Sequence, residues 1–243
     1  MYDDYAHHPT EIAATLSAAK SLKNKVKVHV SEKNEVRILE ADYALLAIGV
    51  TGNIEDNGIE DLGIITENGS IKVNKYNQTN IPNIYAIGDV SGPPWLAHVA
   101  SVQGALSIEH AFEGSAQTID YNNIPGCTYT QPQVGSIGLT EKAALNEGFH
   151  IKVGKYSFKS NGKAMAVGHN DGFVKLIFDE QYGELIGAHI IGSEATELIG
   201  QLSVAKALES TWEDLAFGVF AHPTLSEAIM EAALDAYGIG IHQ

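Results

Sequence analysis

A histidine and a glutamate near the end of the chain have the types and the spacing for acid–base chemistry. His222 stands before Pro223 in a short polar turn, and Glu227 opens an amphipathic segment five residues further on. Histidine can accept and return a proton near neutral pH. A carboxylate on its other ring nitrogen would fix the tautomer and stabilise the imidazolium. The pair therefore predicts a proton-transfer site.

The same residues also have a purely structural interpretation. Thr224-Leu225-Ser226-Glu227 is a capping-box sequence, in which the first and last residues would satisfy free N–H groups at a helix start. One carboxylate oxygen cannot fully serve both a backbone N–H and an imidazole. From the local pattern alone, the catalytic and the capping roles both stay open.

A second motif, Ile84-Tyr85-Ala86-Ile87-Gly88-Asp89-Val90, indicates a cofactor contact. The pattern predicts a hydrophobic strand that ends at Gly88 and Asp89. Glycine lets the backbone come close to a ligand, and a carboxylate can accept hydrogen bonds from ribityl or ribose hydroxyls. The alternative is a strand-end turn capped by an aspartate, and a bare Gly-Asp pair favours that alternative.

Hydrophobic periodicity predicts the elements that must position these residues. A hairpin is expected over 26–39, a buried strand over 41–49, and a helix from about 95 to 112. Further strands are expected at 127–130, 133–138, 150–158, 172–178 and 184–191, and helices from 140, over 193–208, 211–217 and 224–237. Strands grouped before helices indicate an α+β layer with antiparallel pairing.

Composition restricts the class of protein and of partner. The 243 residues are 44% hydrophobic and 19% charged, which is typical of a soluble globular chain with one large or two small domains. The net charge of -15, with Arg37 as the single arginine, argues against nucleic acid and against anionic membranes. No apolar run reaches the length of a membrane span and no signal peptide opens the chain, so the cytoplasm is expected.

Cysteine and histidine usage argues against a redox disulfide and against a metal site. Cys127 is the only cysteine, and beside strand-like residues it is expected to be a buried, inert thiol. Asp3, Asp4, His7 and His8 lack the usual spacing of metal ligands, so no metal is predicted there.

The segment Ala221-His222-Pro223-Thr224-Leu225-Ser226-Glu227-Ala228 resembles the C-terminal signature of dihydrolipoamide dehydrogenases. These are flavin- and pyridine-nucleotide-dependent disulfide oxidoreductases. The resemblance implies that His222 is the base for a dithiol and that Glu227 orients it, acting on the disulfide of the partner subunit. It also implies that Gly88 and Asp89 belong to the family's second FAD motif, with the aspartate on the ribityl chain.

The resemblance further implies cofactors and partners. Leu96, Ala97, His98 and Pro223 would contact the cofactor, with the Leu-Ala-His backbone against the flavin. FAD and NAD are the implied cofactors. The implied partners are a second copy of the chain, in a homodimer, and the lipoamide-bearing acyltransferase of a 2-oxo acid dehydrogenase complex.

These resemblances suggest three segments. Residues 25–115 are expected to be a remnant of α/β, Rossmann-type FAD- and NAD-binding domains, and residues 116–243 an α+β dimerisation domain with an antiparallel sheet. Residues 1–24 resemble instead a segment of UDP-N-acetylmuramate–L-alanine ligases and are expected to be foreign to the rest.

Parts of a complete enzyme of this class have no counterpart in the sequence. It contains no Gly-x-Gly-x-x-Gly turn for a dinucleotide pyrophosphate and no cysteine pair. The chain resembles the C-terminal half of such an enzyme, and alone it is expected to be inactive. The alternatives are a fragment of a glutathione- or mercuric-type reductase, a non-enzymatic dimerisation module, and a ligase fragment.

Overall fold

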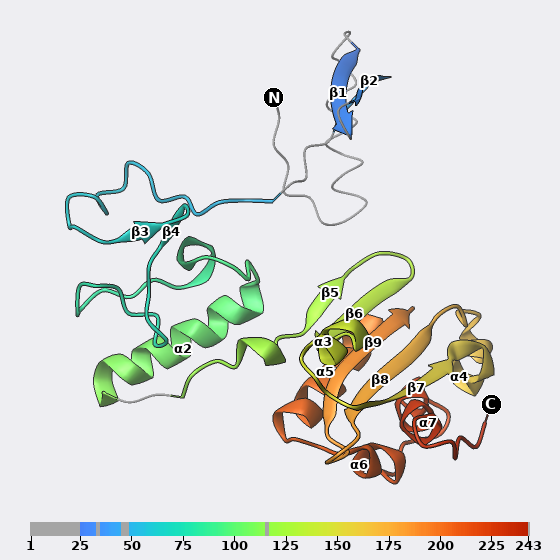
Figure 1. The fold of residues 1–243 in the computed structure, drawn as a ribbon. Helices are drawn as coiled ribbons and strands as arrows, with labels where there is room; N and C mark the ends of the chain where they lie inside the picture. The colour runs from blue at the N-terminus through green and yellow to red at the C-terminus, as the bar shows by residue number, and fades with distance from the viewer. Residues whose placement is uncertain (1–24, 33–34, 45–48, 115–116, 243) are drawn as a thin grey trace. The chain divides into compact units, whose positions relative to one another are not determined.

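The computed structural model describes residues 25–32, 35–44, 49–114 and 117–242. The chain forms two compact units, Met1–Ala100 and Ser101–Gln243 (Figure 1). The segment 1–24 and the domain boundary expected at 115–116 lie outside the described residues. The boundaries proposed from the sequence therefore stay predictions.

The described part of the N-terminal unit starts with the expected hairpin. Strands β1 (Val26–Glu32) and β2 (Glu35–Ala41) pair antiparallel, with Val28 opposite Leu39. The buried strand expected over 41–49 is wrong where its residues are described. Ala41 ends β2, and the chain continues to Ala44 without strand structure or burial, so the hairpin alone is formed here.

A short hairpin and a 3-10 helix follow. Strands β3 (Thr66–Glu67) and β4 (Ser70–Ile71) pair antiparallel. The strand expected over 84–90 is not formed: Tyr85 makes a single bridge to Gln78, and Gly88–Ser91 form the 3-10 helix η1. Ala86 and Ile84 form backbone hydrogen bonds with Asn77 and Thr79 of the neighbouring turn, which is too short to form a ladder.

Helix α2 (Ala97–Glu113) confirms the helix expected after residue 95. It ends at Gly114, whose φ of +74° is the left-handed conformation that glycine adopts at a helix end. None of the described helices is long and apolar enough to cross a lipid bilayer.

The C-terminal unit is built on one antiparallel sheet, which confirms the predicted α+β layer. Its strands lie in the order β5-β6-β9-β8-β7 (Figure 1). They are β5 (Gly126–Thr128), β6 (Gln133–Gly138), β7 (Ile151–Ser157), β8 (Phe173–Asp179) and β9 (Leu185–Gly192).

Helices flank this sheet in positions close to those expected. They are α3 (Glu141–Asn146), α4 (Gly162–Val167), α5 (Ala195–Ala207), α6 (Trp212–Ala216) and α7 (Glu227–Asp235), with the 3-10 turns η2 (Tyr121–Asn123) and η3 (Phe158–Ser160). Helix α4 was not predicted, because six residues carry too little periodicity to reveal it. The asparagine before it and the glycine after it define it locally.

The core of this unit follows from strand alternation. Val174, Leu176 and Phe178 of β8 point to one face, where they pack with residues of α5 and α7. The intervening Ile177 points to the other face and packs with Ala144 of α3. Both faces are thus partly covered, and α7 lies directly on β7 and β8.

Candidate active site

The two residues predicted for acid–base chemistry meet at the start of α7. Nδ1 of His222 lies 2.8 Å from Oε1 of Glu227. The His222 side chain is 78% exposed, whereas that of Glu227 is 21% exposed. A half-buried carboxylate therefore holds one edge of an imidazole whose other nitrogen, Nε2, is open to a reactant. This geometry is suited to proton transfer at Nε2.

The carboxylate of Glu227 serves both of the roles that the sequence left open. Its Oε1 contacts His222, and its Oε2 accepts a hydrogen bond of 2.8 Å from the N–H of Thr224. The Thr224 hydroxyl donates instead to the carbonyl of Ala221 at 2.7 Å, so the capping box is one-sided. Helix α7 accordingly begins at Glu227 and not at the expected Thr224.

These hydrogen bonds govern the protonation of Glu227. Burial alone would raise the pKa of its carboxyl group, but the Thr224 N–H and the His222 imidazole bind the ionised form, and the net effect is a lowered pKa. A carboxylate that remains ionised at neutral pH can hold an imidazole in one tautomer and stabilise its protonated form.

The lowered pKa predicts a pH-dependent stability. A carboxyl group with a depressed folded-state pKa contributes stability that is fully present above its ordinary value of 4.5 and is lost as pH falls through the folded-state value. We expect the free energy of unfolding to decrease less steeply with acidification in Glu227→Gln than in the wild type. Urea denaturation from neutral to acid pH measures both slopes, and equal slopes would contradict this linkage.

A second histidine–glutamate pair, which was not predicted, joins the middle of the same helix to the C-terminal residues. Glu231 is 2% exposed, and its Oε1 lies 2.7 Å from Nδ1 of His242. Its Oε2 accepts hydrogen bonds from the backbone N–H groups of Ile241 and His242, at 3.0 and 3.2 Å. A glutamate on the apolar face of a helix was the signal that could have revealed it.

The buried Glu231 carboxylate should anchor the C-terminal residues. Because hydrogen bonds to a charged group contribute about 1.5–3 kcal/mol, Glu231→Ala should lower the free energy of unfolding by about that amount. It should also accelerate amide exchange at Ile241. Urea denaturation and hydrogen exchange measure the two effects. The exposed Glu213 provides the control, because Glu213→Ala should change neither; an unchanged Ile241 amide in Glu231→Ala would refute the anchor.

The residues predicted to bind cofactor fall into two groups. In the N-terminal unit, Gly88 opens η1 with a φ of +70°, and Asp89 beside it is exposed. Leu96 directly precedes α2, and Ala97 and His98 form its exposed first turn. Pro223 lies instead in the C-terminal unit, exposed and adjacent to His222.

The N-terminal group forms a tight turn against the start of a helix. A Cβ atom at Gly88 would lie 3.3 Å from the Cβ of Ala100, so the turn packs tightly over the first part of α2. The first turn of α2 contains no acidic residue. The flavin contact expected at these residues stays a prediction, and the sequence contains no pyrophosphate-binding turn.

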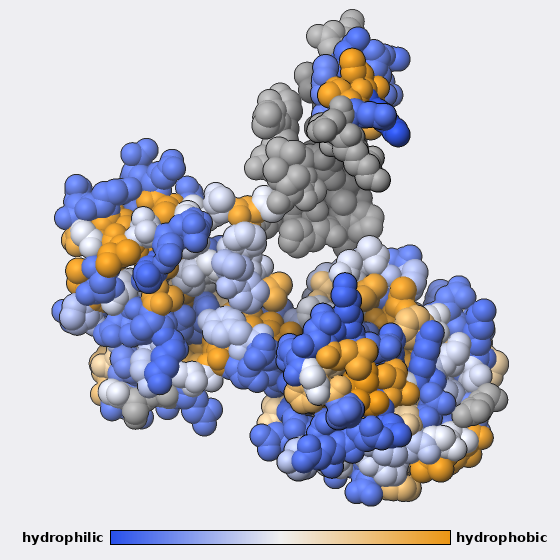
Figure 2. Space-filling model, viewed as in Figure 1, coloured by the Kyte–Doolittle hydropathy of each residue, from blue (hydrophilic) through white to orange (hydrophobic). Residues whose placement is uncertain are grey.

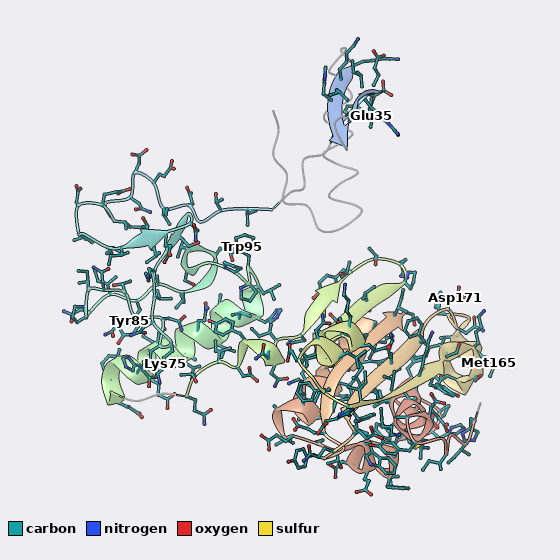
Figure 3. All side chains as sticks on the ribbon, viewed as in Figure 1. Glu35, Lys75, Tyr85, Trp95, Met165 and Asp171 are labelled. Carbon is teal, nitrogen blue, oxygen red and sulfur yellow. The ribbon has the colours of Figure 1, made fainter. Side chains whose placement is uncertain are left out.

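A shallow hollow lies next to these residues but is not formed by them. It is lined by residues of β3, of β4 and of the chain just after β4, by Ser91 at the end of η1, and by the loop before α2, which includes Pro93 and Trp95. Figure 3 shows Trp95 in this loop, just ahead of α2. Neither Gly88 nor Asp89 lines the hollow. We therefore do not identify it with the predicted cofactor contact.

Cys127 has the surroundings of an unreactive thiol. It is unpaired and partly buried against the core of the C-terminal unit. Burial raises the pKa of the thiol, against a smaller opposing effect from a hydrogen bond with Tyr129. Among the described residues, no three histidine, cysteine, aspartate or glutamate side chains gather into a metal site.

Comparison with known families accounts for most of the chain. The family "Pyridine nucleotide-disulphide oxidoreductase, dimerisation domain" matches residues 124–233, and "Pyridine nucleotide-disulphide oxidoreductase" matches residues 9–104. The second match includes residues 9–24, which belong to the segment 1–24 that was expected to be foreign to the rest.

Curated relatives and solved structures agree with these matches. Dihydrolipoyl dehydrogenase from Rhizobium etli is 46% identical over 93% of this chain and 47% of its own length. The Zymomonas mobilis protein of the same name is 47% identical over 82% of this chain and 43% of its own length.

Among solved structures, LpdA from Mycobacterium tuberculosis is 25% identical with a TM-score of 0.77, over 96% of this chain and 53% of that one. The flavoprotein disulfide reductase RclA from Escherichia coli, in its Cu(II) complex, is also 25% identical, with a TM-score of 0.79, over 87% of this chain and 47% of that one. The chain spans about half the length of the curated relatives that it matches. It belongs to the pyridine nucleotide-disulphide oxidoreductase family.

Proposed function

We propose that this chain is the C-terminal part of a dihydrolipoyl dehydrogenase and that it supplies the acid–base dyad, His222 with Glu227. The observation that carries the proposal is the 2.8 Å contact from Nδ1 of His222 to the Glu227 carboxylate beneath an exposed imidazole. Relatives that bear this name, at 46 and 47% identity, support the choice of dithiol as the substrate class.

The reaction of the complete enzyme would convert dihydrolipoamide and NAD⁺ into lipoamide, NADH and a proton. The substrate dithiol loses two electrons and two protons as its S–S bond forms. In this scheme Nε2 of His222 accepts a proton from a substrate thiol, while the Glu227 carboxylate holds Nδ1–H and stabilises the imidazolium. Bound FAD would supply the acceptor that passes the electron pair on to NAD⁺.

The cofactor contacts within this chain are proposals of the same kind. Gly88, Asp89, Leu96, Ala97 and His98 would line the flavin from the N-terminal unit, and Pro223 would contribute beside the dyad. Because the sequence lacks a cysteine pair and both pyrophosphate turns, we propose that these residues need a complementary N-terminal half and that the 243 residues alone are inactive.

A homodimer is the assembly that this proposal implies. Large apolar side chains remain exposed on the C-terminal unit, including Leu208, Phe217 and Val219. Figure 2 shows apolar residues gathered on the surface of this unit. Such exposure is what an interface between subunits requires. The lipoamide-bearing acyltransferase of a 2-oxo acid dehydrogenase complex would be the partner of the complete enzyme, in the cytoplasm.

A chimera tests the proposed function. The N-terminal half of the Zymomonas mobilis dihydrolipoyl dehydrogenase would be joined to residues 25–243 of this chain, and NAD⁺ reduction by dihydrolipoamide would be measured. We expect turnover. A folded, flavin-containing chimera that fails to reduce NAD⁺ whichever dithiol is supplied would refute the proposal. It would favour the non-enzymatic dimerisation module, the alternative that the single cysteine supports.

The visible absorption spectrum of the purified chain tests whether it retains flavin by itself. We expect a colourless protein, because the sequence has no pyrophosphate-binding turn. A flavin band that corresponds to one cofactor per chain would overturn the claim that the N-terminal half is needed for FAD binding.

A further inference from the structure

A buried asparagine connects the dyad to a part of the fold that lies far away in the sequence. Asn161 is 3% exposed and precedes α4. Its Oδ1 accepts a hydrogen bond of 2.9 Å from the N–H of Ala164, which caps the helix. Its Nδ2 donates a hydrogen bond of 3.0 Å to the carbonyl of Thr224, 63 residues away. One amide group thus fixes a helix end and a loop together.

Thr224 is the central residue of the dyad loop, residues 221–226. Its N–H holds Oε2 of Glu227, and its hydroxyl holds the carbonyl of Ala221, the residue before His222. The position of the Thr224 backbone therefore sets both members of the dyad: the carboxylate through one bond and the histidine segment through another. The Asn161 amide fixes this same backbone at its remaining polar group, the carbonyl.

We propose that Asn161 is a positioning residue for the dyad. By holding the Thr224 carbonyl, it keeps the Thr224 N–H directed at Glu227 and so keeps the carboxylate in register with His222. The effect of Asn161 on catalysis rests on the proposed function, whereas its positioning of His222 and Glu227 does not. A buried amide whose donor and acceptor are both satisfied is rigid, because leaving either group unpaired would be costly.

Helix capping alone could also explain a buried asparagine, and two variants separate the explanations. Asn161→Asp keeps an Oδ1 acceptor for Ala164 but replaces the donor toward Thr224 with a second acceptor. Asn161→Ser keeps a capping hydroxyl that is too short to reach Thr224 and adds no charge. Both variants preserve the cap and remove the contact with the dyad loop.

The chain offers two matched controls. Helix α3 has six residues, as α4 does, and Thr140 caps it through a 3.1 Å bond from the N–H of Ala143. Thr140→Ala removes a cap without touching the dyad loop. Gln201 of α5 provides the second control, because it contacts the dyad loop at another residue. Its Nε2 donates a hydrogen bond of 2.8 Å to Oγ of Ser226 on an exposed surface. Gln201→Ala removes an external contact that does not reach the Thr224 backbone.

Amide hydrogen exchange on the full 243-residue chain gives the first result. Loss of one hydrogen-bonded contact in Asn161→Asp or Asn161→Ser should accelerate exchange of the Thr224 amide by about tenfold and leave the Ala164 amide unchanged. Thr140→Ala and Gln201→Ala should leave Thr224 unchanged. Unaltered Thr224 exchange in both Asn161 variants would overturn the proposal, as would equal acceleration of Thr224 and Ala164.

Titration of the Glu227 carboxyl, followed by ¹³C NMR, gives a second result that a merely structural role would not produce. The Thr224 N–H bond is one cause of the lowered pKa of Glu227. In Asn161→Ser this pKa should therefore rise toward its ordinary value, and an unchanged titration would overturn the proposal. An inactive wild-type chimera would instead refute the proposed function and leave both of these results standing.

Discussion

Replacing His222 by glutamine in the chimeric enzyme should reduce dithiol oxidation by about a hundredfold or more. Glutamine is similar in size, but it cannot accept a proton at neutral pH. The His222 side chain is largely exposed, so its replacement should leave the core intact. Steady-state kinetics with dihydrolipoamide and NAD⁺ measures the effect, with flavin content and thermal stability as controls. A variant that retains wild-type turnover would show that this imidazole is not the base.

The matched variant Glu227→Gln separates orientation from helix capping. If the amide oxygen accepts from Thr224, the amide nitrogen faces His222 as a donor and favours the tautomer with the proton on Nε2. That tautomer cannot act as a base at Nε2. A large loss of activity with little loss of stability would support an orienting role. Equal losses of both would support a carboxylate that serves chiefly the helix start.

Local sequence patterns were sufficient to predict most of the C-terminal unit. Its strands alternate strongly, as in Val174, Leu176 and Phe178, and caps such as Thr140 mark the helix starts. The segment 84–90 was wrongly predicted to be a strand, because the prediction used only its hydrophobicity. It is hydrophobic enough for a strand, but strand formation depends on a partner strand, and here Tyr85 forms an isolated bridge with Gln78. Periodicity carries no information on the partner.

The dyad itself could be predicted from residue types, but its arrangement could not. The sequence placed His222 and Glu227 close together, and it left open which oxygen would serve which donor. Only coordinates show that Oε1 and Oε2 divide the two roles. Asn161 lies 63 residues from Thr224, and its contact depends on how α4 packs against the dyad loop. Such long-range polar contacts follow from tertiary packing, which no local pattern encodes.

The same dependence on packing makes Gly154 critical, and Gly154→Ala should be strongly destabilising. Gly154 lies in β7 beneath α7, the helix that carries Glu227. An added Cβ would lie 1.8 Å from the carbonyl oxygen of Ala232 and 2.7 Å from the backbone nitrogen of Ala236. Since both contacts are backbone atoms, one in α7 and one in the residue that caps its C-terminal end, the helix must move away from the sheet.

Overpacking of this kind costs about 3 kcal/mol of unfolding free energy or more, because backbone cannot give way as a flexible side chain can. The shift should also break the 2.8 Å bond from the Lys155 N–H to Asp235 at the end of α7. Urea denaturation measures the loss, and Gly200→Ala is the matched control. Gly200 lies inside α5 with no atom within 4 Å of an added Cβ, so alanine there should stabilise by about 0.5–1 kcal/mol. If Gly154→Ala and Gly200→Ala had the same free energy of unfolding, α7 would not pack closely on β7 at Gly154. This contact could then not be what positions the helix that carries Glu227.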